Sequence, residues 1–151
     1  MNYYRLPDFL TQKKKDQLLD LAYSLKENDW YHHVNTQTGT QSPLRWYGLD
    51  EQFFGKKISL MLIYPNQEQK WHTDIKEIRN TAMIYPVSAN YAPCHVDDDL
   101  VDFPAFINVQ VKHAVFNNNK LRINLQASFM ESIEDCVNMF HKDENYELHT
   151  S

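Results

Sequence analysis

Two short strands joined by a turn are predicted by the stretch HAVFNNNKLRINL, residues 113–125. β-Branched and aromatic residues flank the turn Asn117-Asn118-Asn119, which is typical of a strand, a turn and a second strand. Similar runs occur upstream, so seven strands are expected, over residues 44–48, 58–64, 69–73, 81–87, 94–96, 106–115 and 121–128. Because no helical pattern separates these runs, they favour an antiparallel sandwich or barrel over a doubly wound sheet.

Helical patterns flank the strands. Apolar residues recur at helical spacing from Gln12 to about Asn28, with Thr11 as the expected N-cap. A short C-terminal helix is expected over 132–140, where Ser132 and Asp135 resemble a capping box. The polar segment 31–45 is interpreted as a loop or a weak hairpin. We therefore expect one domain over residues 1–151, with core strands at about 44–130.

Composition excludes several classes of protein. The 151 residues carry a net charge of -5, which opposes binding to phosphate backbones by charge alone. Three glycines form no phosphate-binding loop, and two cysteines form neither a disulfide framework nor a four-cysteine zinc site. The first ten residues do not resemble a signal peptide, and the longest apolar run, 58–64, is too short to span a membrane. These features predict a soluble cytoplasmic protein that binds neither nucleic acid nor membranes.

The tripeptide His72-Thr73-Asp74 is the main candidate for a metal site. Residues two apart on a strand point to the same face, so an imidazole and a carboxylate here can hold one ion. His113, which lies 41 residues further on, is the best candidate for a third ligand. Two histidines and one carboxylate on one face of an octahedron leave three positions open, as in non-haem Fe(II) oxygenases. The alternative for each histidine is a hydrogen-bonded structural role.

A lone arginine, Arg122, lies among Leu121, Ile123 and Leu125, nine residues after His113. A hairpin is expected to bring its strand back beside the strand of His113. The side chain alternates away from its apolar neighbours, so it points either to solvent or into the barrel. In the barrel it would hold a carboxylate through two parallel hydrogen bonds.

The order and spacing of these four residues resemble the 2-oxoglutarate- and Fe(II)-dependent dioxygenases. The prolyl hydroxylase and aspartyl/asparaginyl β-hydroxylase branches are the most similar. The resemblance covers residues 58–130, about half of the chain, and includes Tyr64-Pro65 before the His-x-Asp motif. Arg79 and the run Thr81 to Tyr85 resemble the strand that follows the motif.

This resemblance implies a mainly β fold, a double-stranded β-helix of the jelly-roll or cupin-like type with a supporting N-terminal helix. It implies Fe(II) bound by His72, Asp74 and His113, and 2-oxoglutarate bound through its distal carboxylate by Arg122. O2 would be a substrate, and ascorbate a possible supporting reductant.

Three further residues are given roles by the resemblance. Tyr64 and Tyr85 are candidates to hydrogen-bond the cosubstrate, although core packing is an equal alternative for both. Arg79 would contact a cosubstrate or substrate carboxylate, unless it is a surface residue.

The resemblance also bears on the substrate. Nucleic-acid dealkylases of this family carry a second arginine six residues after the first, and Ser128 stands there instead. We therefore expect hydroxylation of a peptide side chain or a small amino-acid-like molecule. The alternatives are a non-catalytic cupin-like module that binds metal or carboxylate, and a cupin-type metalloenzyme that does not use 2-oxoglutarate.

Overall fold

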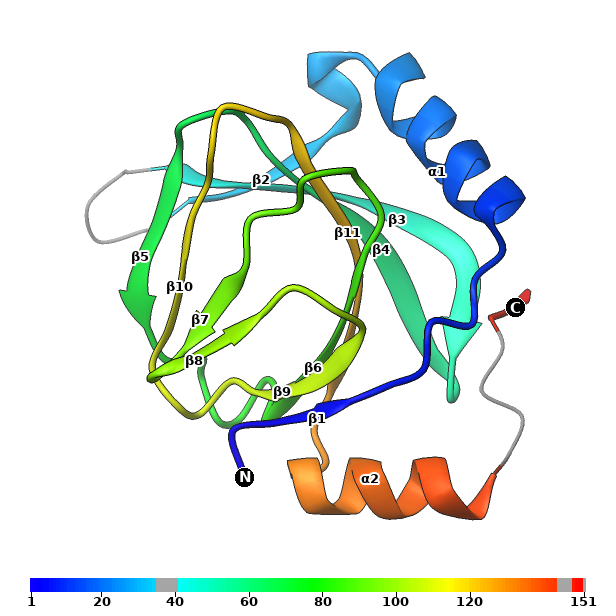
Figure 1. Cartoon of the computed structure of the whole chain (residues 1–151), viewed down its shortest axis with the longest axis vertical. Coiled ribbons are helices and arrows are strands. Elements are labelled where there is room, and N and C mark those ends of the chain that lie inside the picture. The colour runs from blue at the N-terminus through cyan, green and yellow to red at the C-terminus, as the bar shows by residue number, and fades with distance from the viewer. Residues whose placement is uncertain (35–40, 144–147, 151) are drawn as a thin grey trace.

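Two antiparallel sheets face each other in the computed structural model, which describes residues 1–34, 41–143 and 148–150 (Figure 1). The mainly β fold predicted from the sequence is confirmed.

The larger sheet has eight strands. They are β1 (Tyr3–Arg5), β2 (Tyr31–Val34), β3 (Gln41–Phe53), β4 (Lys56–Ile63), β6 (Thr81–Pro86), β9 (Ala105–Asn108), β11 (Arg122–Phe129) and β12 (His149–Thr150). Their order is β1-β9-β6-β11-β4-β3-β12, and β2 pairs with β3 outside this path.

The smaller sheet has four strands in the order β5-β10-β7-β8. They are β5 (Glu68–His72), β7 (Cys94–Val96), β8 (Asp99–Val101) and β10 (His113–Phe116). From β4 to β11 the chain passes back and forth between the two sheets, which is the winding of a double-stranded β-helix.

Two predictions about the late strands are wrong. The run 106–115 is two strands, because a turn at Asn108–Val111 moves the chain from β9 in the large sheet to β10 in the small one. The expected hairpin between the strands of His113 and Arg122 does not form, since β10 and β11 belong to different sheets. The Asn117 side-chain amide secures the crossing by donating to the carbonyls of Ile63, Tyr64 and Lys120.

The segment expected as a loop or weak hairpin contributes two paired strands. β2 pairs antiparallel with β3, and β3 is much longer than the strand predicted at 44–48. Residues 35–40, which belong to the same predicted segment, lie outside the described residues.

Helices α1 (Gln12–Ser24) and α2 (Ile133–Lys142) cover the outer face of the large sheet (Figure 1). The predicted caps form, because Thr11 accepts a hydrogen bond from the Lys14 amide and Ser132 accepts one from the Asp135 amide. α1 ends earlier than predicted, and a 3-10 turn, η1 (Glu27–Asp29), follows it. In the described part of the chain, neither helix has the length and apolar character needed to cross a membrane.

Strand β11 separates the apolar core from the interior of the barrel. Ile123, Leu125 and Phe129 are fully buried in the core beneath the helices. The alternate residues face the space between the sheets; they are Arg122, Asn124, Gln126 and Ser128. The polar half of this alternation supplies one wall of the site described below.

Phe53 anchors the core at the end of β3. Its ring is fully buried and contacts the rings of Phe9 and Phe106. We expect Phe53→Ala to lower the free energy of unfolding by about 3–5 kcal/mol, because it removes a large side chain from a packed core. Chemical denaturation followed by far-UV circular dichroism measures this change. Phe116→Ala is the matched control, since Phe116 is 40% exposed and should cost about 1 kcal/mol or less. Equal losses in the two variants would contradict the packing described here.

Candidate metal centre

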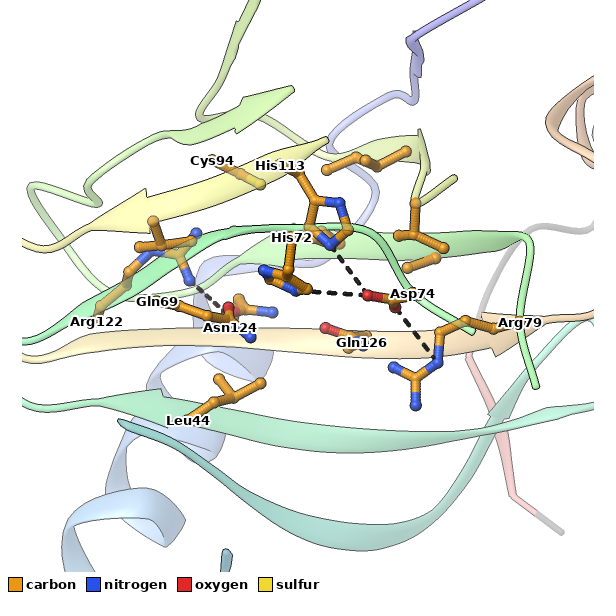
Figure 2. Close-up of a pocket in the computed structure, with 15 residues that line it drawn as sticks. Leu44, Gln69, His72, Asp74, Arg79, Cys94, His113, Arg122, Asn124 and Gln126 are labelled. Carbon is orange, nitrogen blue, oxygen red and sulfur yellow. Dashed lines mark hydrogen bonds and ion pairs between the residues drawn. The ribbon is translucent and has the colours of Figure 1, made fainter. Parts of the chain in front are cut away.

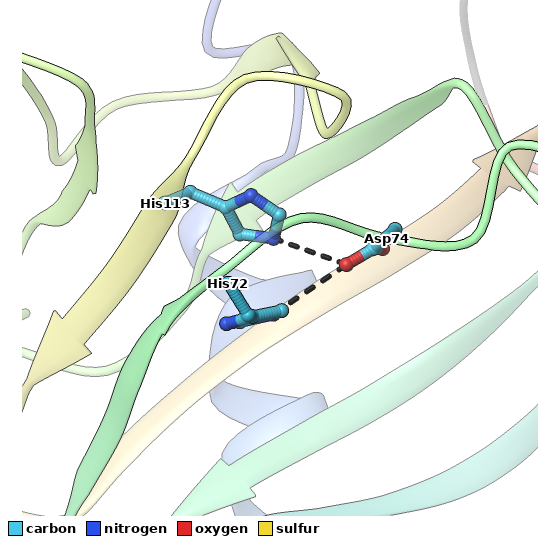
Figure 3. A group of neighbouring side chains, drawn as sticks. All are labelled: His72, Asp74 and His113. Carbon is cyan, nitrogen blue, oxygen red and sulfur yellow. Dashed lines mark ion pairs between the residues drawn. The ribbon is translucent and has the colours of Figure 1, made fainter.

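Three potential metal ligands meet at the end of the small sheet (Figure 3). His72 ends β5 and pairs directly with His113, which begins β10. The Oδ1 atom of Asp74 lies 3.4 Å from Nε2 of His72 and 3.2 Å from Nε2 of His113. One ligand atom from each side chain lies within 4.8 Å of the others, so the three residues singled out in the sequence come together.

Backbone carbonyls orient both imidazoles. Nδ1 of His72 lies 2.7 Å from the carbonyl oxygen of Lys70, and Nδ1 of His113 lies 2.8 Å from that of Val111. In the neutral rings these carbonyls favour a proton on Nδ1, which leaves the lone pair of Nε2 facing the shared centre. Each ring is thereby prepared to bind a cation.

Asp74 lies in the loop after β5, and this loop is fixed from a distant part of the chain. The Asp74 amide donates to the carbonyl of Val109 over 2.9 Å. The side-chain amide of Gln110 donates to the carbonyls of Asp74 and Arg79, over 3.2 and 2.9 Å. The carboxylate position therefore depends on the turn between β9 and β10.

Arg79 reaches the same carboxylate. Its Nε atom lies 3.6 Å from Oδ2 of Asp74, on the side away from the histidines. From the sequence, Arg79 could be either a surface residue or a residue that contacts a carboxylate. In the structure its side chain lines the cavity.

The surroundings of Asp74 and His72 shift the pKa values of both side chains. Burial alone would raise the pKa of Asp74, but hydrogen bonds from His113 and His72, together with the charges of His113 and Arg79, hold that pKa well below its ordinary value. The hydrogen bond to Asp74 raises the pKa of His72, against the opposing effect of burial. The site therefore combines an anionic carboxylate with two imidazole nitrogens, a donor set that suits a divalent cation.

Arg122 lies at the opposite end of the pocket (Figure 2). Its side chain is buried, with Nε donating to the Ala92 carbonyl over 2.9 Å and Nη1 donating to Oδ1 of Asn124 over 3.2 Å. The guanidinium lies 4.0 Å from the centre of the Tyr91 ring. Nη2 is buried and has no hydrogen-bond partner among the described residues, and the same holds for the Tyr91 hydroxyl. An unpaired buried donor is costly, so this end is suited to an anionic ligand.

The triad and Arg122 line one cavity of ≈ 90 Å³. Gln69, Asn124 and Gln126 line it between these ends, and Leu44 lies opposite them (Figure 2). The volume is well below the roughly 300–1,000 Å³ of pockets for drug-sized ligands, so the cavity suits a small molecule.

The two predicted tyrosines lie outside this cavity. The Tyr64 hydroxyl donates to Oε2 of Glu27 over 2.7 Å. The Tyr85 hydroxyl accepts from the Leu10 amide and bonds to Asp8 on the helix-covered face of the large sheet. The structure therefore gives both hydroxyls structural partners, and neither is brought to the metal centre.

Sequence reasoning missed the polar residues that do line the cavity. Asn124 and Gln126 follow Arg122 at alternate positions, so the period of two along one strand could have identified them. No sequence signal distinguished Tyr91, whose contact with Arg122 arises from a loop.

Neither a family model nor a curated protein matches the sequence. Among solved structures, the viral collagen prolyl hydroxylase vCPH from Paramecium Bursaria Chlorella virus-1, solved as a 2OG complex, superposes with a TM-score of 0.56 at 10% identity. That match covers 85% of this chain and 95% of the hydroxylase.

Two more solved structures are similar. An oxidoreductase of the 2OG-Fe(II) oxygenase family from Burkholderia pseudomallei has a TM-score of 0.55 at 8% identity, over 84% of each chain. AviO1 from Streptomyces viridochromogenes Tue57 has a TM-score of 0.50 at 12% identity, over 87% of this chain and 91% of AviO1. The chain has the fold of the 2OG-Fe(II) oxygenases. The resemblance inferred from the sequence is thus confirmed at the level of the fold.

The donor set fits the iron that this oxygenase fold implies. Two imidazole nitrogens and one carboxylate oxygen match the facial arrangement of non-haem Fe(II) sites. Arg122, whose buried Nη2 is unpaired, lines the same cavity, and its charge suits a carboxylate such as those of 2-oxoglutarate.

Metal binding at this centre should weaken in acid. Because its pKa is raised, His72 retains a proton at pH values where an ordinary imidazole is neutral. As the pH falls through that raised pKa, protons compete with the metal for Nε2, and the affinity drops by up to about tenfold per pH unit. Asp74 stays ionised over this range, because its pKa is below its ordinary value.

Calorimetry with Mn(II), from about pH 8 to about pH 5.5, measures this dependence. Repeating the titrations in buffers of different ionisation enthalpy counts the protons released on binding. A constant affinity with no proton release would contradict the assignment of His72 as a ligand.

Proposed function

We propose that this protein is an Fe(II)- and 2-oxoglutarate-dependent dioxygenase. The observation that carries the proposal is that a single cavity is lined both by the His72, Asp74 and His113 cluster and by Arg122, whose buried Nη2 is unpaired. A metal-binding module needs only the first feature, whereas the oxygenase needs a metal face and a carboxylate anchor together.

Each residue has a distinct task in this proposal. His72, Asp74 and His113 hold Fe(II) and leave the positions opposite them open to small ligands. Bound iron and 2-oxoglutarate supply the oxidation with O2, and the protein supplies binding and orientation. Arg122 holds the distal carboxylate of 2-oxoglutarate, and the Tyr91 ring packs against its guanidinium.

The rest of the cavity limits access of water. Ile107, Val109 and Val115 line it from β9 and β10 and from the turn between them, and all are buried. Asn124 orients Arg122, because its Oδ1 atom accepts a hydrogen bond from Nη1 and keeps the arginine side chain at the cavity wall. A dry, preorganised site of this kind protects reactive chemistry from solvent.

For the substrate, we propose a peptide side chain or a small amino-acid-like molecule, and not nucleic acid. The support is the absence of a second arginine on β11, where the exposed Ser128 stands, together with the net charge of -5. A cytoplasmic location and the absence of membrane binding are retained as predictions from the sequence.

Turnover with Fe(II) tests the proposal directly. We expect the wild-type protein with ascorbate to consume O2 and convert 2-oxoglutarate to succinate and CO2 slowly without substrate, because ascorbate then supplies the two electrons that reduce the second oxygen atom. Asp74→Asn removes the anionic ligand and should reduce turnover at least about 100-fold and abolish tight Mn(II) binding. Asp98→Asn is the matched control, because Asp98 is an exposed aspartate on the β7–β8 turn and should change neither.

Turnover assays should include peptide and amino-acid pools, which are expected to increase CO2 release. Tight binding of metal and 2-oxoglutarate without any turnover in all these conditions would contradict the enzyme and favour a carboxylate-binding module.

Arg122→Lys should separate cosubstrate binding from metal binding. Lysine keeps the charge but cannot form two parallel bonds, so the affinity for 2-oxoglutarate should fall at least about tenfold. The affinity for Mn(II) should change little, since Arg122 lies at the opposite end of the cavity from Asp74 (Figure 2). Calorimetry with Zn(II)-loaded protein measures 2-oxoglutarate binding without oxidation. Unchanged affinity for 2-oxoglutarate would remove Arg122 from the proposed role.

A further inference from the structure

A second, larger hollow adjoins the metal cavity. Its volume is ≈ 440 Å³, and it shares Arg79 and Gln126 with the smaller cavity. The two spaces are therefore neighbours along the inner face of β11, and we call the larger one the outer groove. A molecule bound in the outer groove would lie beside the metal centre.

The lining of the outer groove is cationic. Lys56, Lys57 and Arg79 line it, and no acidic residue does so among the described residues. Lys56 lies 3.2 Å from a carboxylate oxygen of Glu131, and Arg79 is paired with Asp74. Lys57 makes no ion pair in the described part of the chain. The local charge is thus opposite in sign to the net charge of -5, so it cannot be inferred from composition.

Strand register separates this cationic end from Arg122. On the inner faces, Arg122 pairs with Ile63 and Gln126 pairs with Ser59, and Lys57 is two residues beyond Ser59 on β4. At about 3.4 Å per residue, Lys57 is about 20 Å along the strand from the level of Arg122. One molecule of 2-oxoglutarate is too short to span this separation.

The outer groove also has an apolar wall and space for the lysine. Trp46 and Met61 line it, and the ring of Tyr31 stacks on Trp46 with 4.8 Å between ring centres. Gly48 has no side chain, and a Cβ atom there would lie 3.6 Å from Cε and 3.8 Å from Nζ of Lys57. The lysine chain therefore passes over a bare part of β3.

We infer that the substrate is an organic anion that binds in the outer groove. Its apolar part lies against Trp46 and Met61, and its carboxylate or phosphate group lies at Lys57. The oxidation of that molecule rests on the proposed function, whereas its binding does not. The inference narrows the substrate class to acidic molecules.

Glycine signals provide a direct test of binding. The chain has only three glycines, of which Gly55 lines the outer groove and Gly48 lies beneath Lys57. Glycine-selective isotope labelling therefore gives a simple NMR spectrum with two local reporters. The protein, loaded with Zn(II) and saturating 2-oxoglutarate, is titrated with phenylacetate, phenyl phosphate and the uncharged phenylacetamide.

The charged probes should shift the Gly48 and Gly55 signals in a saturable manner, and phenylacetamide should bind at least about fivefold more weakly. Lys57→Ala should weaken the binding of the charged probes by a similar factor, and Lys57→Arg should restore their affinity. Lys13→Ala is the matched control, because Lys13 is exposed on α1 and should have no effect. The tighter of the two charged probes identifies carboxylate or phosphate as the preferred group.

Equal binding of phenylacetamide and phenylacetate, or wild-type binding by Lys57→Ala, would overturn the inference. Repeating the titration with Asp74→Asn, without Zn(II) and 2-oxoglutarate, separates it from the proposed function. Lys57-dependent anion binding by a wild-type protein that does not turn over 2-oxoglutarate would support the inference and contradict the proposed function. Turnover of 2-oxoglutarate without Lys57-dependent anion binding would support the proposed function and contradict the inference.

Discussion

The pairing of His113 with His72 across β5 and β10 is the constraint on which the rest of the site depends. A shift of one residue in a strand would turn one histidine to the outer face of the small sheet. The register changes immediately after this pair, between His113 and Val115, so the pairing is specified locally and not by a long regular ladder. Carbonyls of Lys70 and Val111 then fix the rings, which links the backbone of each strand to the direction of its metal-binding nitrogen.

The third ligand is held in a different way, because Asp74 lies beyond the end of β5. A loop residue would ordinarily be free to move, but here its amide bonds to Val109 and its carbonyl to the side chain of Gln110. Both partners belong to the turn that carries the chain from β9 to β10. This turn therefore positions the carboxylate and also leads into the strand of His113. The crossing between sheets, which sequence analysis treated as one continuous strand, is thus part of the site.

The sequence predicted the fold and the converging metal cluster because these depend on local alternation and on order along the chain. It left open whether Tyr85 faces the cosubstrate or the core, for a physical reason. Both faces of β6 are largely buried, so its run of apolar residues does not reveal which side chains face the barrel. In β11 the alternation of Arg122 and Asn124 with apolar residues does reveal it. The contact between Arg122 and Tyr91 depends on tertiary packing, which no local pattern encodes.

The buried Arg122 makes one end of the cavity chemically different from the other. A guanidinium with one unpaired buried donor lowers stability, since such a group costs about 1–3 kcal/mol. A carboxylate that reaches Nη2 removes this cost, and by linkage the folded protein is stabilised by the ligand that binds there. The Arg122 end of the cavity is therefore the end whose charge favours a small anion. The other cations of the inner surface, Arg79 and Lys57, line the outer groove, so positive charge lies at both ends of the connected spaces.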